Sequence, residues 1–464
     1  MLTLFWTDAL FFILLLMVGA MIIAMRRREH LRRPWRKVAR STAAMVSLVV
    51  LLFYLAVAVL DSIHFYPSGS GGEAGNDFKT ESISLLDAWV VPLRTRVEKT
   101  YSLPFAAYAY AKENVRTADG GQRWDFPRLE FGASHLADPE SEKAGDIVLT
   151  GLRGVAEGLA IWGGLSLALV WLIARVHKVA CLRAWCDVAC GRTEVPWRAT
   201  LLTVLFLCVA GGACAEWSLK YHVFGTDKVG EDVLYQTLKS IRTGLLIGTL
   251  TTFVTLPLAL ILGVVAGYFR GWVDDLIQYL YTTLNSMPGV LLIAAAILLT
   301  QVYMAKHEDE FASLALRADL RLLFLCLILG ITSWTGLCRL LRAETLKLRE
   351  MEYVQAARAL GVRQDVILLR HIVPNVFHIV LISVALDFSS LVLAEAVLSY
   401  VNIGVDPTTE SWGNMINSAR LELAREPPVW WSLAAAFLFM FALVLAANLF
   451  ADAVRDALDP RRSE

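Results

Sequence analysis

A glycine-framed loop that could bind phosphate occurs at residues 225–230, which read GTDKVG. A phosphate loop of the GxxxxGK[ST] type needs a lysine and then a hydroxyl residue after its second glycine. Glu231 and Asp232 occupy these two positions, and carboxylates repel phosphate. The sequence also has no H-E-x-x-H and no G-x-S-x-G motif, so we predict no nucleotide site and no catalytic residues in this chain.

One histidine and three cysteines could together bind a metal ion. His177, Cys181, Cys186 and Cys190 follow an H-x3-C-x4-C-x3-C pattern, whereas structural zinc sites use C-x2-C pairs. On a single helix they form two pairs on different faces, so four ligands converge only if the chain turns. We expect ordinary small residues here and no metal site, with metal binding as the alternative.

Two carboxylates lie inside one strongly apolar stretch. Asp387 and Glu395 are eight residues apart and project to roughly the same side of a helix. Ionisable groups at membrane depth usually face a bundle interior or a wet pathway, because burying them in lipid is expensive. A role in lining a pathway and a hydrogen-bonded packing or interfacial role both stay open.

The apolar stretches around these residues predict an all-α, polytopic membrane protein. The 464-residue chain is 56% hydrophobic and 19% charged, and several apolar blocks reach the roughly 20 residues that cross a bilayer. We expect about nine spanning helices, near residues 4–25, 39–60, 155–174, 199–217, 243–268, 277–303, 321–341, 376–400 and 430–451. Pro257 and Pro288 interrupt two of them and are candidate kinks. A formal net charge of zero gives no indication of nucleic-acid binding.

Basic loops predict the orientation of these helices. Residues 26–40, 175–198 and 339–371 and the C-terminal tail are rich in arginine and lysine, which mark cytoplasmic loops. The N-terminus is then outside, the C-terminus is cytoplasmic, and residues 61–153 form an extracytoplasmic segment. This segment opens with the linker PSGSGGEAGN, and its later part predicts short amphipathic helices broken at Pro92 and Pro104. A small folded cap and a partly ordered loop are the two interpretations.

The polar segment EYVQAARALGVRQDVILLRHIVPN, residues 352–375, separates two apolar stretches. Residues 340–360 are strong helix formers, and the small Ala356 and Ala357 allow another protein to approach closely. Gly361 can adopt the left-handed conformation that ends a helix, and Pro374 is suited to the first turn of the next one. We predict a rigid helix–turn–helix that projects into the cytoplasm, with a second short helix over 362–372.

This segment resembles the EAA loop of the membrane subunits of binding-protein-dependent ABC importers. The matching residues are Gln355, Ala356, Ala357, Gly361, His371 and Pro374, preceded by Glu352. The stretch is most similar to the C-type permease subunits of dipeptide and oligopeptide importers. Three further segments match that family in order: 224–234, 395–416 and 451–461. The resemblance covers about residues 199–464.

The resemblance implies a fold and a set of partners. Six C-terminal helices would form a type I ABC permease core over 199–464, and loop 344–374 would seat in an ATPase subunit and couple its closure to transport. A second homologous permease, two ATPases that bind ATP and Mg²⁺, and an extracytoplasmic substrate-binding protein complete such a system in the bacterial inner membrane. The chain itself would need no cofactor and would contact only these proteins and lipid.

The sequence departs from the family pattern at two positions. Gln355 replaces the leading glutamate of the EAA motif, so any ion pair of that glutamate is lost or supplied by another residue. Glu231 replaces an arginine in the turn that holds Gly225, Thr226, Asp227, Gly230 and Asp232. This turn would lie outside, where the family implies a place for the substrate-binding protein.

The first 198 residues lie outside the resemblance. They add two helices over 1–60, the external segment 61–153, and a third helix with a basic loop over 154–198, which we expect to pack peripherally and to cap the outer mouth or bind an accessory protein. A stand-alone secondary transporter or channel is the alternative function, but it usually shows inverted repeats, and none is evident here. A membrane sensor would need a larger cytoplasmic output domain than the short C-terminal tail.

Overall fold

The computed structural model of the chain is mainly helical and describes residues 2–3, 5–26, 29–65, 82–116, 122–307 and 314–458. The predicted linker at 67–76 and the last six residues of the tail lie outside the described residues. Contacts divide the chain into two units. The first holds residues 1–3, 35–242 and 410–450, and the second holds residues 4–34, 243–409 and 451–464.

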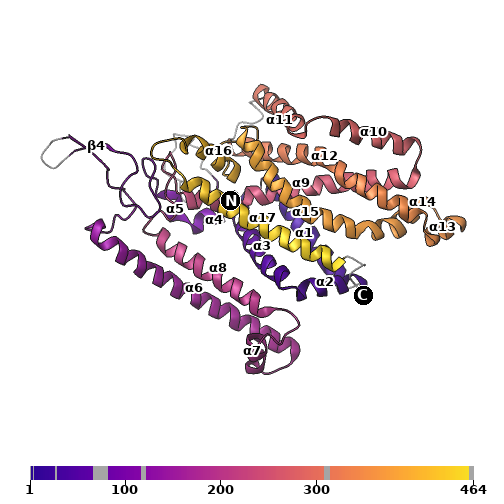
Figure 1. Cartoon of the computed structure of the whole chain (residues 1–464), viewed down its shortest axis with the longest axis horizontal. Helices are drawn as coiled ribbons and strands as arrows, with labels where there is room; N and C mark the ends of the chain where they lie inside the picture. The colour runs from indigo at the N-terminus through magenta and orange to yellow at the C-terminus, as the bar shows by residue number, and fades with distance from the viewer. Residues whose placement is uncertain are drawn as a thin grey trace. The chain divides into compact units, whose positions relative to one another are not determined.

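The first unit contains four membrane-length helices and an irregular insert. The helices are α3 (Thr42–Asp61), α6 (Pro139–His177), α8 (Trp197–Ser218) and most of α17 (Trp431–Leu458). The short helix α7 (Cys181–Ala189) joins α6 to α8, and α16 (Trp412–Glu422) precedes α17. Figure 1 shows α6 and α8 side by side over most of their length.

Close backbone contact explains why α6 and α8 pair. A Cβ atom added at Gly154 or Gly158 of α6 would clash with the carbonyl oxygens of Gly212 or Cys208 on α8. Small residues four apart let membrane helices approach in this way. Helix α6 also begins at Pro139, capped by Asp138, so it extends well into the segment predicted as an external loop.

The insert between α3 and α6 contains short elements. They are β2 (His64–Phe65), β3 (Ile83–Ser84), α4 (Leu85–Trp89), α5 (Val91–Thr95) and the hairpin β4 (Glu113–Arg116) and β5 (Gln122–Asp125); β1 (Leu2–Thr3) pairs with β2. The chain leaves the helical conformation at Val90, between α4 and α5, and Pro92 lies in the first turn of α5, where its missing N–H is not needed. The break predicted at Pro92 is therefore present, two residues before the proline.

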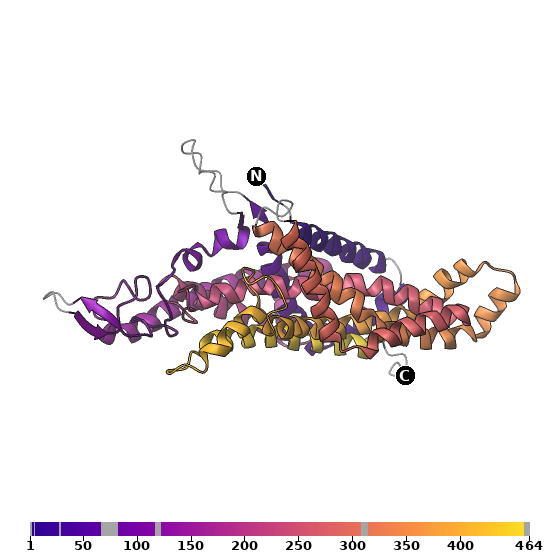
Figure 2. The same ribbon diagram turned by 90° about the horizontal axis from the view of Figure 1, so that it is seen from above.

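The second unit is a helical bundle with a protruding loop. It contains α1 (Trp6–Arg26), most of α9 (Val233–Phe269), α10 (Trp272–Ser286), α11 (Gly289–Lys306), α12 (Leu314–Arg349) and α15 (Val373–Tyr400). Between α12 and α15 lie α13 (Glu352–Ala359), α14 (Gln364–Ile367) and the π-helical turn η1 (Leu368–Ile372). Figure 2 shows this connection projecting beyond the ends of α12 and α15. The basic helix α2 (Glu29–Arg40) begins in this unit and ends in the first.

In the described part of the chain, eight helical segments are long and apolar enough to cross a membrane. The seventh predicted span, 321–341, lies within α12, which is not one of the eight. The predicted span 277–303 is not one helix, because the chain is extended at Met287, directly before Pro288. Proline disfavours helical backbone at the residue before it, and the next helix starts afresh at Gly289. Helix α9 continues through Pro257.

Candidate functional site

The α13–η1 segment, here called the coupling loop, is built on a glycine turn. Gly361 has φ +72°, and its N–H donates to the carbonyl of Arg358, while the N–H of Val362 donates to Ala357. This pair of bonds is the Schellman arrangement, which ends a helix on a left-handed residue. The predicted helix end at Gly361 is therefore present. Sequence reasoning missed a second break at Glu350–Met351, which separates α13 from α12.

One side of the coupling loop is anchored in an apolar core. Val354, Ile367 and Ile372 are at most 2% exposed and pack in a cluster that includes Tyr268 of α9 and Leu341 of α12. Burying such side chains stabilises the loop by about 1.5–3 kcal/mol each. The loop is therefore held against two long helices rather than hanging free.

The other side of the coupling loop is open. Leu360 is 84% exposed and Leu369 is 71% exposed, and Ala356 and Glu352 are also on the surface. Apolar side chains grouped on a surface usually mark a place where another protein binds. Ala356 presents no bulky side chain there, so a partner can approach the helix backbone closely.

Gln355 makes the contacts that a glutamate could not. Its Nε2 donates to the carbonyl oxygen of Glu350 at 3.1 Å and lies 3.5 Å from the carboxylate of the same residue. That carboxylate also pairs with Arg270 at 3.1 Å. An amide donor at position 355 thus suits an acidic neighbour, whereas a carboxylate there would face a like charge.

A π-helical turn leads from the loop into α15. The N–H of Val373 donates to the carbonyl of Leu368, five residues back, and Pro374 follows. Proline has no N–H and its ring clashes with the preceding turn, and a widened turn accommodates it. Nearby, Asn375 donates to the carbonyl of His371 at 2.6 Å and to the hydroxyl of Tyr353 at 3.0 Å, which ties α15 to α13. The sequence pattern predicted the helix start but not the π turn.

The GTD turn, residues 225–232, is partly covered by the chain's own insert, while Lys228 and Val229 at its tip are exposed. Thr226 is 0% exposed and Asp232 3%, and the Thr226 hydroxyl donates to the carbonyl of Thr100 at 2.8 Å. Gly225 and Gly230 both have positive φ, and a Cβ atom at either would clash with insert carbonyls, those of Ser102 and Glu98 respectively. The glycines are required by this close approach.

The carboxylates of the GTD turn shape the turn itself. Asp227 accepts hydrogen bonds from the N–H groups of Val229 and Glu231, each at 2.9 Å. Asp232 accepts from the N–H of Leu234 at 2.8 Å and so caps the start of α9. These bonds give both residues a local structural role.

A buried ionic triad joins the insert to the turn. His222, 4% exposed, contacts Asp232 through Nδ1 at 2.7 Å and Glu98 through Nε2 at 3.4 Å. Burial alone would lower the pKa of His222, but its hydrogen bond to Asp232 and the negative charge of the nearby Glu98 raise that pKa to about 9. Burial would raise the pKa of Glu98, but His222 and three backbone N–H groups, from residues 130–132, lower it to about 2. His222 and Glu98 are therefore both charged at neutral pH.

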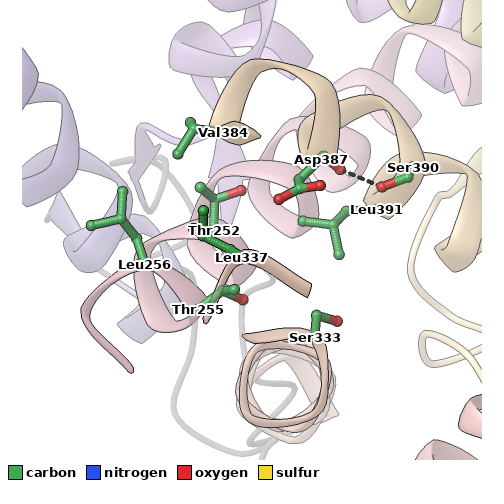
Figure 3. Close-up of a pocket in the computed structure, with 9 residues that line it drawn as sticks. All are labelled: Thr252, Thr255, Leu256, Ser333, Leu337, Val384, Asp387, Ser390 and Leu391. Atoms are coloured by element: carbon green, nitrogen blue, oxygen red, sulfur yellow. Dashed lines mark hydrogen bonds between the residues drawn. The ribbon is translucent and has the colours of Figure 1, made fainter. Parts of the chain in front are cut away.

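A polar cavity of about 180 Å³ lies within the second unit, among α9, α12 and α15. Figure 3 shows the nine lining residues, which are Thr252, Thr255, Leu256, Ser333, Leu337, Val384, Asp387, Ser390 and Leu391. Five are polar, and Asp387, near the middle of α15, is the one charged residue among the nine. Ser390 donates to the backbone carbonyl of Asp387, which leaves the Asp387 carboxylate facing the cavity.

The structure separates the two carboxylates predicted to share a helix side. Glu395 is 1% exposed, accepts a hydrogen bond from Ser399 at 2.8 Å and does not line the cavity. The eight-residue spacing leaves the two side chains about 80° apart around the helix, enough for different surroundings. The cysteines at 181 and 186 are exposed on α7 and Cys190 is exposed directly after it, and the His177 side chain lies outside what the structure describes.

Comparison with known proteins matches the C-terminal part of the chain. Residues 259–464 match the family described as the binding-protein-dependent transport system inner membrane component. The oligopeptide transport system permease protein OppC of Mycobacterium tuberculosis is 33% identical over 239 residues, 52% of this chain and 76% of that protein. OppC of Haemophilus influenzae is 32% identical over 241 residues, covering 52% and 71%. The glutathione transport system permease protein GsiD of Pectobacterium atrosepticum is 31% identical over 242 residues, covering 52% and 73%.

Proposed function

Because this chain belongs to the family of inner-membrane components of binding-protein-dependent transport systems, we propose that it is the permease subunit of a peptide-class ABC importer. A substrate-binding protein delivers a peptide or related small solute from outside, and a second homologous permease completes the path. Two ATPase subunits bind ATP and Mg²⁺ and hydrolyse the ATP. The N-terminus is outside the bacterial inner membrane and the C-terminus is in the cytoplasm.

The coupling loop carries this proposal. It is anchored on one side by Val354, Ile367 and Ile372 and presents Leu360 and Leu369 on the other. A force on the open side is therefore passed through a rigid helix–turn–helix to α12 and α15. Since α15 also contributes Asp387 to the cavity, closure of an ATPase on the loop acts on a helix that lines the path.

The cavity supports a transport role. Asp387 is exposed on this chain in the middle of a membrane-length helix, beside Thr252, Ser333 and Ser390. An exposed carboxylate at that depth is expensive in lipid, so this face lines a wet path or meets another protein. Both suit a subunit that forms half of a translocation pathway.

The insert covers part of the place that the family implies for the binding protein. Because Thr226 and Asp232 are buried under insert residues, the insert forms the outer surface there together with the exposed Lys228 and Val229 of the turn. We propose that the substrate-binding protein meets the insert and that residues 61–153 form part of the fold rather than a peripheral addition.

A pull-down of the tagged chain in mild detergent tests the proposed assembly. We expect a second permease and ATPase subunits to co-purify with the wild type, and the ATPase to be lost with Leu360→Asp or with Gly361→Pro, which cannot adopt φ +72°. Leu182→Asp is the matched control, since Leu182 is 82% exposed on α7 outside the loop. A wild-type chain that purifies alone, or ATPase recovery equal in all variants, would contradict the proposal.

A further inference from the structure

The cavity on α15 has an excess of hydrogen-bond acceptors. Thr252 donates its hydroxyl proton to the carbonyl of Gly248 at 2.7 Å, and Thr255 donates to that of Thr251 at 2.9 Å. Ser390 likewise donates to the carbonyl of Asp387 at 2.7 Å. A hydroxyl whose proton is used in this way offers only its lone pairs to a ligand.

Among the nine lining residues, the carboxyl group of Asp387 is the one ionisable group beside these acceptors. No hydrogen bond or ion pair to that carboxylate comes from the residues that the structure describes, and none of the other eight lining residues is charged. By contrast, Glu395 on the same helix is buried and accepts from Ser399. Asp387 is thus the carboxylate of α15 that is left open to a solute.

Position and size restrict what can satisfy such a group. Asp387 lies fourteen residues after Val373 in the 28-residue helix α15, close to its midpoint. A negative charge at membrane depth needs a cation or water beside it. The volume of about 180 Å³ is several times the roughly 30 Å³ of one water molecule, so a small polar group fits.

We propose that this cavity binds a primary ammonium group of the transported solute, with Asp387 as its counter-charge. An ammonium has three N–H donors and no acceptor, which complements one carboxylate surrounded by hydroxyl oxygens. The importer then favours solutes with a free amine over the same solutes with the amine blocked. This inference rests on the proposed transport function and adds a recognition step within the membrane.

Uptake of peptide mixtures tests the inference. Right-side-out membrane vesicles that carry the complete transport system and contain ATP receive a tripeptide library without Lys, Arg or His. A second sample is the same library N-acetylated, and a third is an N-acetylated library with one lysine per peptide. Imported peptides are measured by mass spectrometry. The amount of ATPase subunit that co-purifies with each variant is measured by pull-down.

We expect the wild type to import the free-amine library in preference to the acetylated one. Losing a charge-assisted hydrogen bond is worth about 1.5–3 kcal/mol, so Asp387→Asn is expected to reduce free-amine import about tenfold or more. Asp387→Glu keeps the charge and restores import, and ATPase recovery is unchanged in both. Glu395→Gln, the matched loss of a carboxylate outside the cavity, keeps the preference for the free amine.

The outcomes separate the two proposals. Import that is unchanged by Asp387→Asn, or a wild type that takes up blocked and free peptides equally, would overturn the ammonium site while leaving the importer intact. Recovery of import with the acetylated lysine library would place the recognised amine on a side chain instead of the N-terminus. A wild-type chain that recovers no ATPase and imports nothing would overturn the proposed function itself.

Discussion

The turns at Gly361 and at Gly230 use the same backbone conformation in opposite surroundings. Gly361 has φ +72°, and a Cβ atom there would meet no atom of the described chain within 4 Å. Gly230 has φ +86°, and a Cβ atom there would clash with the backbone of Glu98. The turn at Gly361 projects from the second unit, and the turn at Gly230 is buried against the insert.

This difference shows that a sequence motif does not by itself reveal accessibility. Both turns match the family pattern, and both were expected to meet other proteins. The coupling loop keeps an open face, with Leu360 84% exposed, whereas the GTD turn is partly covered: Thr226 is 0% exposed and Val229 is 57% exposed. In this chain the residues added before the family core cover part of the GTD turn and leave Lys228 and Val229 at the surface.

The largest expected effect on stability comes from replacing the glycine of each turn by alanine, which adds one methyl group. Gly361→Ala incurs only the strain of a left-handed alanine, about 1 kcal/mol. Gly230→Ala incurs that strain and forces apart two packed backbones, at roughly 4 kcal/mol or more in total. Thermal unfolding and the yield of monodisperse protein in detergent measure both variants. Similar losses for the two would contradict the contrast between an open and a buried turn.

Removal of the insert's carboxylate is the next largest change. Glu98→Ala leaves His222 with one of its two counter-charges and leaves three backbone N–H groups without an acceptor. Breaking a buried ion pair costs about 3 kcal/mol or more, so we expect a clear drop in the unfolding midpoint. Glu130→Ala is the control, because that side chain is exposed nearby and its loss should change stability by less than about 0.5 kcal/mol. Equal stability of the two variants would show that the triad does not secure the insert.

The triad also predicts that stability depends on pH. The pKa of His222 is raised from 6.5 to about 9, so its contribution is full below pH 6.5 and is lost as pH rises through 9. The pKa of Glu98 is lowered, so the stability that its negative charge contributes to the fold is lost at acid pH, as pH falls from 4.5 through 2. The difference in unfolding midpoint between wild type and His222→Gln should therefore shrink between pH 6.5 and 9. A constant difference over that range would argue against a charged His222.

Local patterns allowed the coupling loop to be predicted from the sequence. The helix formers, two alanines, one glycine and one proline of this loop determine the backbone conformation only of residues close to them in sequence. The roles of Gly361 and Pro374 could therefore be predicted from spacing alone. The break at Glu350–Met351 and the π turn were missed because they depend on how the loop packs against Tyr268 and Leu341. The break before Pro288 and the unbroken helix at Pro257 show that tertiary context decides what a proline does.

The triad could not be predicted from the sequence. Glu98 contacts residues 130–132 and His222, which are more than thirty and more than one hundred positions away, and no periodic pattern encodes such pairings. The α6–α8 contact did leave a signal in the closely spaced glycines at 154 and 158, which a search for small residues four apart would have found. Asp387 and Glu395 were found as candidates, but only packing distinguished the open carboxylate from the buried one.

The smallest expected effect tests whether the glutamine of the coupling loop is matched to its neighbour. Gln355→Glu places a second carboxylate about 3.5 Å from that of Glu350, on the exposed side of the turn that joins α12 and α13. Repulsion between exposed like charges is worth only about 0.5 kcal/mol, and Arg270 on Glu350 offsets part of it. We expect a small decrease in the unfolding midpoint that disappears in the double variant with Glu350→Gln and at high salt. An unfolding midpoint that rises with Gln355→Glu would instead mean that the natural glutamine at position 355 has lost a favourable ion pair of the family's glutamate. The open turn at Gly361 and the buried turn at Gly230 would then differ from the family pattern for different reasons.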